Sequence, residues 1–346
     1  MTNGAASAAR DFAHRLLAWY DRAARRLPWR VPPGSSAMPD PYRVWMAEIM
    51  LQQTTVAAVA GYFERFTARW PTVADLAAAD DADVMAAWAG LGYYARARNL
   101  LACARAVVTE HRGRFPETEA GLRALPGVGD YTAAAVAAIA FGRPAVVVDA
   151  NIERVIARHR LIETPLPAAK REIKAALAPL VPDDRPGDFA QGLMDLGATI
   201  CTPRSPACSL CPVMDDCRAR SCADLERLPV KPPKKAKPQR YGVAHWIERD
   251  ERIWLIRRPA KGMLGGMRAL PGGEWCATPP PESGIARVDH SFTHFDLRLT
   301  LVRGEWPDEA TDAAAEGEWW PLSALDAAGL PTLYRKLIDR LREVKE

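Results

Sequence analysis

Four cysteines stand close together in this chain, at Cys201, Cys208, Cys211 and Cys217, and they constrain its folding more than any other feature. Their spacing, C-x6-C-x2-C-x5-C, contains one short C-x2-C pair, whereas tetrahedral zinc sites usually have two such pairs separated by a longer spacer. The spacing therefore favours a four-thiolate iron–sulfur cluster over a zinc ion. A disulfide framework is the third possibility, but 7 cysteines in 346 residues, an odd number, indicate a reducing compartment.

A basic, proline-rich stretch divides the chain. Residues 227–240 (RLPVKPPKKAKPQR) contain six Lys or Arg, four prolines and no acid. This composition is typical of an extended, solvated linker, and contact with phosphate is the alternative that stays open. The net charge of +4 is too small by itself to establish a polyanionic partner. No apolar run approaches the ~20 residues of a transmembrane helix, and the N-terminus shows no signal-peptide pattern.

The hydrophobic pattern differs on the two sides of this stretch. Asp40 and Pro41 predict the start of a helix that continues to about residue 66. Further helices are expected at 73–88, 95–111, 130–141, 151–160, 170–180 and 187–200. After the linker we expect a hairpin of 243–248 with 253–258, a strand at 298–303 and a helix at 332–344. The predicted organisation is a multidomain one: an all-α domain at 1–222, a linker at 223–240 and a smaller α+β domain at 241–346.

The segment 125–142 (LPGVGDYTAAAVAAIAFG) carries the first chemical motif. Gly127 and Gly129 allow a tight turn, and a new helix is expected to begin at Asp130. Backbone N–H groups at such a turn and at a helix N-terminus form an anion site. The pattern predicts a helix-hairpin-helix motif over about 118–142 that contacts DNA phosphate without reading sequence. An ordinary helical hairpin is the alternative.

Two carboxylates are placed for chemistry on a sugar. Asp149 follows an apolar run and precedes a helix that opens near Asn151, where the helix dipole favours an ionised side chain. An anion there could stabilise an oxocarbenium-like sugar when a base departs, although a plain N-cap fits the same pattern. Glu48 shares a helix face with Trp45 and Leu51, and this apolar environment should raise its pKa. A protonated Glu48 could act as a general acid.

The order of the turn, the following aspartate and the four-cysteine loop resembles the endonuclease III superfamily of base-excision DNA glycosylases. Within that superfamily, PYRVWMAEIMLQQTTV and GLGYYARARNL resemble the adenine DNA glycosylases, the MutY family. The resemblance extends over about 10–220 and more loosely over 241–346. It implies an enzyme of base-excision repair with a [4Fe-4S] cluster at 201–217. Its substrate would be adenine paired with 8-oxoguanine or guanine in double-stranded DNA, and we expect a monomer in the cytoplasm, associated with the nucleoid.

The resemblance also implies roles for individual residues. Glu48 would protonate the departing adenine at N7, Asp149 would stabilise the sugar cation, and Asn151 would hydrogen-bond near both. The DNA-facing edge would consist of Gln52, Gln53 and the inserted aromatic Tyr93, which offset the stacking lost when a nucleotide is extruded. The adenine pocket would contain Trp29, Arg30 and Gln191.

Position 131 separates two chemistries within the superfamily. Members that also cleave the DNA backbone carry a lysine just after the glycine turn, and its amine forms a Schiff base with the sugar. This chain has Tyr131, and a phenol cannot form an imine. We therefore expect a monofunctional glycosylase in which Tyr131 hydrogen-bonds to the catalytic carboxylates.

The C-terminal part resembles the 8-oxoguanine-recognition domain of the family, which is related in fold to Nudix hydrolases. The R-E-x-x-E-E carboxylate cluster of a working Nudix enzyme is missing from 262–290, so nucleotide hydrolysis is not expected. Phe292, Thr293 and His294 resemble the Phe-Ser-His loop by which the family reads 8-oxoguanine. An alternating strand with outward polar residues is the alternative.

Two other functions stay open. One is an endonuclease III-like glycosylase and lyase for damaged pyrimidines, against which Tyr131 and the C-terminal domain count. The other is a non-catalytic iron–sulfur DNA-binding protein, against which Glu48 and Asp149 count.

Overall fold

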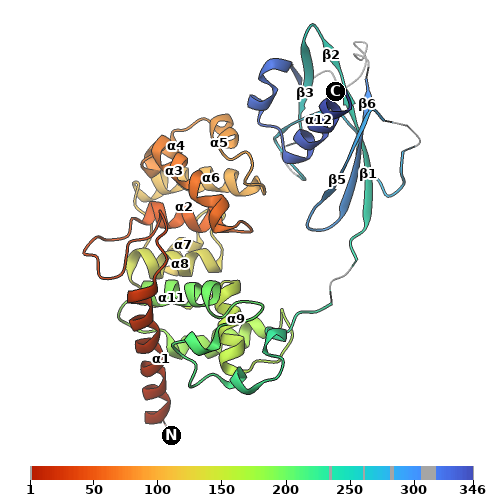
Figure 1. The fold of residues 1–346 in the computed structure, drawn as a ribbon. Helices are drawn as coiled ribbons and strands as arrows, with labels where there is room; N and C mark the ends of the chain where they lie inside the picture. Colours follow the sequence, from red (N-terminus) through yellow and green to blue (C-terminus); the bar gives the residue numbers. More distant parts are fainter. Residues whose placement is uncertain (1, 234–235, 260–261, 281–283, 305–316, 346) are drawn as a thin grey trace. The chain divides into compact units, whose positions relative to one another are not determined.

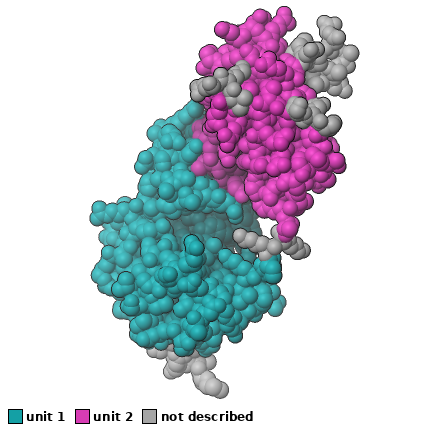
Figure 2. Space-filling model, turned by 45° about the vertical axis from the view of Figure 1, so that its right-hand side comes forward, with its two compact units in different colours: residues 1–78, 99–233 teal, residues 79–98, 234–346 magenta. Residues whose placement is uncertain are grey.

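The structure is a computed structural model that describes residues 2–233, 236–259, 262–280, 284–304 and 317–345. Two compact units are distinguished in Figure 2: Met1–Ala78 with Asn99–Pro233, and Ala79–Arg98 with Lys234–Glu346. Residues 234 and 235 of the predicted linker and residues 281–283 of the segment searched for Nudix carboxylates lie outside the described residues. Within the described ranges, no helix is long and apolar enough to cross a membrane.

The first unit is built from helices (Figure 1). They are α1 (Thr2–Ala23), α2 (Pro41–Leu51), α3 (Val56–Arg69), α4 (Val73–Ala77), most of α6 (Ala95–His111), α7 (Glu119–Arg123), α8 (Asp130–Phe141), α9 (Ala150–Arg160), α10 (Ala169–Leu177) and α11 (Pro186–Thr199). Helix α8 is apolar on nearly all sides, which is typical of a helix at the centre of a core. It packs against α2, α7 and α11, and its alanines allow these neighbours to approach closely. This packing brings α2 and α8 together at the point where the predicted acid and tyrosine lie.

The predicted continuous helix from Pro41 to residue 66 is wrong. Helix α2 ends at Leu51, and the chain turns through Gln53, whose φ is 57°, before Thr55 caps α3 by accepting from the Ala58 N–H. Gln53 in the left-handed conformation and Thr55 as a helix cap both interrupt the helix. Hydrophobic periodicity carries no signal for either of them. The turn at residues 52–55 consequently leaves the helix and presents its side chains to a cavity described below.

The predicted helix at 73–88 is also interrupted. It forms α4 and a separate α5 (Asp81–Ala87), because Asp80 accepts from the Ala82 N–H at 2.8 Å and starts a new helix. The helices predicted at 95–111, 130–141, 151–160 and 187–200 begin and end within two residues of the predicted bounds, and the last turn of 170–180 is a 3₁₀ helix at Ala178–Leu180. Helix α1 was not predicted.

The second unit contains two small sheets and a C-terminal helix. Strand β6 (Asp296–Arg303) lies between β1 (Gln239–Trp246) and β5 (Ala286–Ser291), while β3 (Arg252–Arg257) pairs with β2 (Glu248–Arg249), β4 (Arg268–Ala269) and β7 (Gly317–Pro321). Helix α12 (Thr332–Lys345) packs on β5. Buried side chains from both sheets and from α12 share one core cluster, including Leu255, Leu299 and Leu337. This is a small α+β module, as the pattern predicts.

The predicted hairpin of 243–248 with 253–258 is correct only for its innermost residues. Glu248 and Arg249 pair with β3 around the turn, but β1 pairs in parallel with β6, with Val243 opposite Thr300. An alternating pattern identifies a strand and its buried face, but it does not identify a partner distant in sequence. The local turn signal therefore led to the wrong partner for most of β1.

Candidate active site

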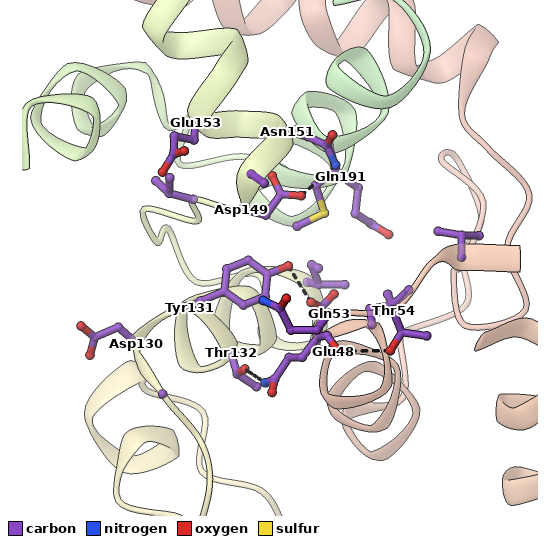
Figure 3. A pocket seen from close by; sticks show the side chains of 18 of the residues that line it. Glu48, Gln53, Thr54, Asp130, Tyr131, Thr132, Asp149, Asn151, Glu153 and Gln191 are labelled. Atoms are coloured by element: carbon purple, nitrogen blue, oxygen red, sulfur yellow. Dashed lines mark hydrogen bonds between the residues drawn. The ribbon is translucent and has the colours of Figure 1, made fainter. Parts of the chain in front are cut away.

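One cavity of about 1050 Å³ in the first unit collects most of the predicted site residues. Helix α2, the turn after it, the start of α8, the start of α9 and the middle of α11 all contribute side chains (Figure 3). The predicted residues that line it are Trp29, Arg30, Glu48, Gln52, Gln53, Gly127, Gly129, Tyr131, Asp149, Asn151 and Gln191. Figure 3 shows Asp149 and Asn151 on one side of the cavity and Glu48 and Tyr131 on the other.

Glu48 is a buried acid at the end of this cavity. Helix α2 begins at Asp40, which accepts from the Tyr42 N–H, and it places Glu48 with only 6% of its surface exposed. Burial raises the pKa of Glu48 to about 7; the hydrogen bond from Tyr131 lowers it and the nearby Asp149 carboxylate raises it. A carboxyl group with this pKa is substantially protonated at neutral pH, so it can donate a proton to a departing group.

Tyr131 connects α8 to this acid. Its hydroxyl donates a hydrogen bond to Oε2 of Glu48 at 2.7 Å. Burial and the two nearby carboxylates raise the pKa of Tyr131 well above its ordinary value, so the phenol stays neutral and remains a donor. The side chain occupies the position after the glycine turn, and its hydrogen bond goes to Glu48 rather than to Asp149.

Asp149 is the N-cap of α9. It accepts from the Ile152 N–H at 2.7 Å and from Nδ2 of Asn151 at 3.0 Å. These hydrogen bonds stabilise the ionised form, as expected for a helix N-terminus, but burial outweighs them and raises the pKa of Asp149 above its ordinary value. The helix dipole alone predicts the opposite direction, since it ignores the cost of removing the carboxylate from water.

Arg154 is a site residue that the sequence analysis missed. It lies one turn after Asn151 on α9 and donates to Oδ1 of Asn151 at 3.0 Å, to the Gly197 carbonyl at 2.7 Å and to the Cys201 carbonyl at 2.8 Å. A chain of hydrogen bonds thus runs from Asp149 through Asn151 and Arg154 to the backbone of the first cluster cysteine. The i to i+3 spacing of Asn151 and Arg154 is the sequence signal for this contact.

One wall of the cavity is held by a buried acid, Asp195, which the sequence analysis also missed. Asp195 is fully buried and accepts from Nε of Arg25 at 2.6 Å and from Nη1 of Arg30 at 2.8 Å. These ion pairs fix the Leu27–Arg30 segment, so that Trp29 and Arg30 line the cavity. Gln191 precedes Asp195 by one turn of α11, so the two side chains lie on the same face of that helix. This i to i+4 spacing is the sequence signal that could have identified Asp195 as a residue near the cavity.

The predicted helix-hairpin-helix motif consists of α7, a turn and α8. Gly127 has a φ of 72°, and a Cβ there would lie 2.5 Å from Cβ of Asn99. Gly129 is the N-cap of α8, and no side chain caps the first turn. The backbone N–H groups at this helix start are therefore available to an anion.

The four cysteines line one small cavity between α9 and the loop that follows α11. Arg158, which is 2% exposed, donates to the Thr202 carbonyl at 2.7 Å, to the Pro203 carbonyl at 2.9 Å and to Sγ of Cys201 at 3.5 Å. Burial raises the pKa of Cys211 to about 12, and the other three cysteines add to this effect, so four thiolates require a cationic centre among them. The donor set therefore fits an iron–sulfur cluster.

The remaining predicted residues belong to the second unit. Tyr93 precedes α6 with a φ of 48° and 53% of its surface exposed. Phe292, Thr293 and His294 form the turn between β5 and β6, and the Thr293 hydroxyl lies 3.3 Å from the Tyr93 hydroxyl. Thr293 and His294 are exposed, whereas Phe292 is half-buried and packs against the core cluster. In the described part of 262–290 no helix is present that could carry Nudix carboxylates.

Comparison with known proteins agrees with this arrangement. Residues 46–182 match the HhH-GPD superfamily of base excision DNA repair proteins, 201–217 match the iron–sulfur binding domain of endonuclease III, and 242–340 match the NUDIX domain. The adenine DNA glycosylase of Homo sapiens is 38% identical over 94% of this chain and 73% of its own length. That of Rattus norvegicus is 45% identical over 89% of this chain and 74% of its own length. The chain belongs to the adenine DNA glycosylase family.

Solved structures match part of this family member. A thermostable thymine-DNA glycosylase has a TM-score of 0.54 and 32% identity, with 62% of this chain and 97% of that chain covered. Endonuclease III in a non-covalent DNA complex has a TM-score of 0.51 and 25% identity, with 61% and 94% covered. The expected fold class is confirmed: a helix-hairpin-helix glycosylase domain with a [4Fe-4S] motif, followed by a Nudix domain. The chain is a DNA glycosylase of base-excision repair, a hydrolase of N-glycosyl bonds that carries a [4Fe-4S] cluster.

Proposed function

We propose that this enzyme removes adenine paired with 8-oxoguanine or guanine and leaves an abasic site without cutting the strand. The observation that carries the proposal is the pairing of two unlike carboxylates in one cavity. Glu48 is buried with a pKa of about 7 and bonded to a tyrosine, while Asp149 lies across the cavity at a helix N-terminus. Such a pair of carboxylates in different environments supports an acid and an anionic stabiliser.

Base departure requires the bond between C1′ and N9 to break with its electron pair going to the base. A proton from Glu48 to N7 neutralises this charge, so adenine leaves as a neutral molecule. Asp149 offsets the positive charge that develops on the sugar. A water molecule then adds to C1′ while its proton passes to the ionised Glu48, which restores the acid. Asn151 orients Asp149 through their 3.0 Å hydrogen bond. The cluster holds the Cys201–Cys217 loop and takes no part in these steps.

The adenine base is proposed to bind between the Trp29–Arg30 segment and α11. Gln191 is 5% exposed and offers an amide that can both donate and accept, which suits the edge of adenine. The Asp195 ion pairs hold Arg30 in place, so the pocket is formed before the base arrives. Preorganised groups lose little entropy on binding, which favours the extruded base.

DNA is proposed to contact the uncapped start of α8 through phosphate, and the turn at Gln52 and Gln53 through the base stack. Tyr93 fits an inserted wedge because it is exposed and held in a left-handed conformation by the segment before α6. Thr293 and His294 offer a hydroxyl and an imidazole to the N7–H and the C8 oxygen that distinguish 8-oxoguanine from guanine. The proposal includes that the enzyme acts as a monomer on chromosomal DNA in the cytoplasm.

The absence of a strand-cutting step follows from Tyr131. A neutral phenol bonded to Glu48 cannot form the imine on which lyase chemistry depends. This residue also argues against the pyrimidine-damage glycosylase and lyase as the function of this chain.

Single-turnover assays on three duplexes test the proposal. Adenine opposite 8-oxoguanine and adenine opposite guanine should be excised, with the first preferred, and thymine glycol should be left intact. The product strand should break only after hot alkali, and borohydride should trap little covalent complex. Efficient strand cleavage without alkali, or excision of thymine glycol at a comparable rate, would contradict the proposal.

A further inference from the structure

The turn between β5 and β6 divides its residues between solvent and core. The Phe292 N–H donates to the Phe295 carbonyl at 2.9 Å and closes the turn, with Thr293 and His294 exposed at its tip. The rings of Phe292 and Phe295 lie 5.0 Å apart and pack inward. Lys237 donates to the Phe292 carbonyl at 2.6 Å. The backbone that presents the tip therefore depends on how Phe292 is held.

Trp275 is the aromatic residue outside this turn that contacts both of its phenylalanines, while the His290 ring on β5 also meets Phe292 edge-on at 4.6 Å. Its indole stacks on Phe292 with ring centroids 5.4 Å apart and an interplanar angle of 26°, and it meets Phe295 edge-on at 5.9 Å. The Arg258 guanidinium lies 5.1 Å from the indole centroid and also donates to the Tyr334 hydroxyl on α12. Trp275 thus joins the turn to β3 and α12 through side chains alone.

The segment that carries Trp275 is itself fixed to β1. Tyr241 and Cys276 exchange two backbone hydrogen bonds of 2.8 and 2.9 Å, and the His245 N–H donates to the Pro271 carbonyl at 2.8 Å. Gly242 provides the space for the indole, because a Cβ at this position would lie 2.5 Å from Cδ1 of Trp275. A bulky ring placed over a glycine on a fixed strand has little freedom to move.

We propose that Trp275 is a positioning residue for recognition of the base opposite adenine. By holding Phe292, it sets the position of the Thr293 hydroxyl and the His294 imidazole, without contacting DNA itself. The inference rests on the proposed function, in which this tip reads 8-oxoguanine. A small displacement of a recognition group is enough to break its hydrogen bonds. Loss of Trp275 should therefore weaken the preference for 8-oxoguanine over guanine, while the rate of base removal by Glu48 and Asp149 should not depend on it.

The readout is the ratio of single-turnover excision rates for adenine opposite 8-oxoguanine and opposite guanine, measured on the full-length enzyme. Trp275→Leu should lower this ratio about five- to tenfold, the range expected for loss of one aromatic stack. Trp275→Phe keeps a ring against Phe292 and should restore most of the ratio. Trp319→Leu is the matched control, because Trp319 pairs with Trp254 on the other sheet of the same unit, and it should leave the ratio unchanged.

Gly242→Ala provides a second test that leaves the indole in the chain. The added methyl group should displace Trp275 and lower the ratio in the same direction, even if Trp275→Leu proves too unstable to purify. An equal fall of both rates in Trp275→Leu or in Gly242→Ala would overturn the inference and make Trp275 a purely structural residue. Failure of Trp275→Phe to restore the ratio would also count against it.

A double variant separates this inference from the proposal beneath it. Thr293→Ala with His294→Ala should lower the ratio at least as far as Trp275→Leu does. If the double variant keeps the wild-type ratio, the tip does not read the lesion, and both the proposed role of the tip and the inference about Trp275 fail. If the double variant loses the ratio while Trp275→Leu keeps it, the tip reads the lesion without help from Trp275, and only the inference fails.

Discussion

The hydrogen bond between Tyr131 and Glu48 makes a sharp prediction about pH dependence. If protonated Glu48 is the general acid, excision should be fastest below the Glu48 pKa of about 7 and should fall tenfold per unit at higher pH. The Tyr131 hydroxyl donates to Glu48 and stabilises its ionised form, so this bond lowers the pKa. Tyr131→Phe removes the bond, and the alkaline limb should therefore move to higher pH.

The size of the shift follows from the strength of the bond. A hydrogen bond to a charged group contributes about 1.5–3 kcal/mol, and one pKa unit corresponds to about 1.4 kcal/mol. The limb should thus move upward by about 1 to 2 pH units. Burial, which is the largest cause of the raised pKa, is unchanged by this substitution. The absolute rate below the limb is not diagnostic, because loss of the hydroxyl can also let the carboxyl group rotate.

The assay is single-turnover excision of adenine opposite guanine between pH 5.5 and 9 at constant ionic strength. Tyr42→Phe is the matched control. It removes a buried hydroxyl that donates at 2.8 Å to the Trp70 carbonyl from α2, the helix that also carries Glu48, and it should leave the pH at which excision begins to fall unchanged. A limb that stays put or moves to lower pH in Tyr131→Phe would refute the assignment of Glu48 as the titrating acid or of Tyr131 as its donor.

Four further outcomes are expected. Asp149→Asn should reduce excision by several orders of magnitude while the dissociation constant for duplex DNA changes little, as measured by rate and by gel shift. Glu48→Gln should raise the free energy of unfolding at pH 8. The stability that protonated Glu48 allows below pH 4.5 is lost in the wild type as pH rises through about 7, and glutamine cannot ionise. The gain, measured by denaturant unfolding, should be about 3 kcal/mol at pH 8 and near zero at pH 4.5. Arg154→Leu should slow excision about tenfold or more by releasing Asn151, with iron content tested separately. Cys208→Ser should lose iron and the visible absorbance of the cluster, whereas Cys103→Ser, which changes a buried cysteine outside the cluster loop, should keep both.

Sequence reasoning located the residues whose signal is local. Glu48 was found from its apolar helix neighbours, and the turn at Gly127 and Gly129 from its glycine pattern, of which Gly127 has the left-handed φ of 72° that favours glycine. Asp149 was found as a helix N-cap, but the direction of its pKa was not, because burial depends on elements distant in the sequence. The same reason explains why Asp195 was missed: its partners Arg25 and Arg30 are separated from it by about 165 residues or more.

The C-terminal module illustrates a second limit. Alternation identified β1, β3 and β6 but not β5 or β7, and the parallel pairing of β1 with β6 required knowledge of the core that both strands share. The resemblance placed Phe292 with Thr293 and His294 in the loop that reads 8-oxoguanine, but it did not reveal that the Phe292 ring packs on Trp275 and Phe295. A motif names the residues of a loop, but which of them point outward is decided by the packing beneath it.

The start of α8 has a consequence for how a lesion is found along a genome. Gly129 and Tyr131 are two residues apart, so the backbone N–H groups proposed to bind phosphate and the phenol that donates to Glu48 belong to one turn. A strand gripped at this turn presents its nucleotides at a constant offset from the acid, whatever their bases. Because the proposed phosphate contact uses main-chain atoms, it would hold every sequence equally, and the enzyme would test successive adenines by moving from phosphate to phosphate. Movement along the strand would then depend on residues other than those that read the opposite base, so that each could be altered without the other.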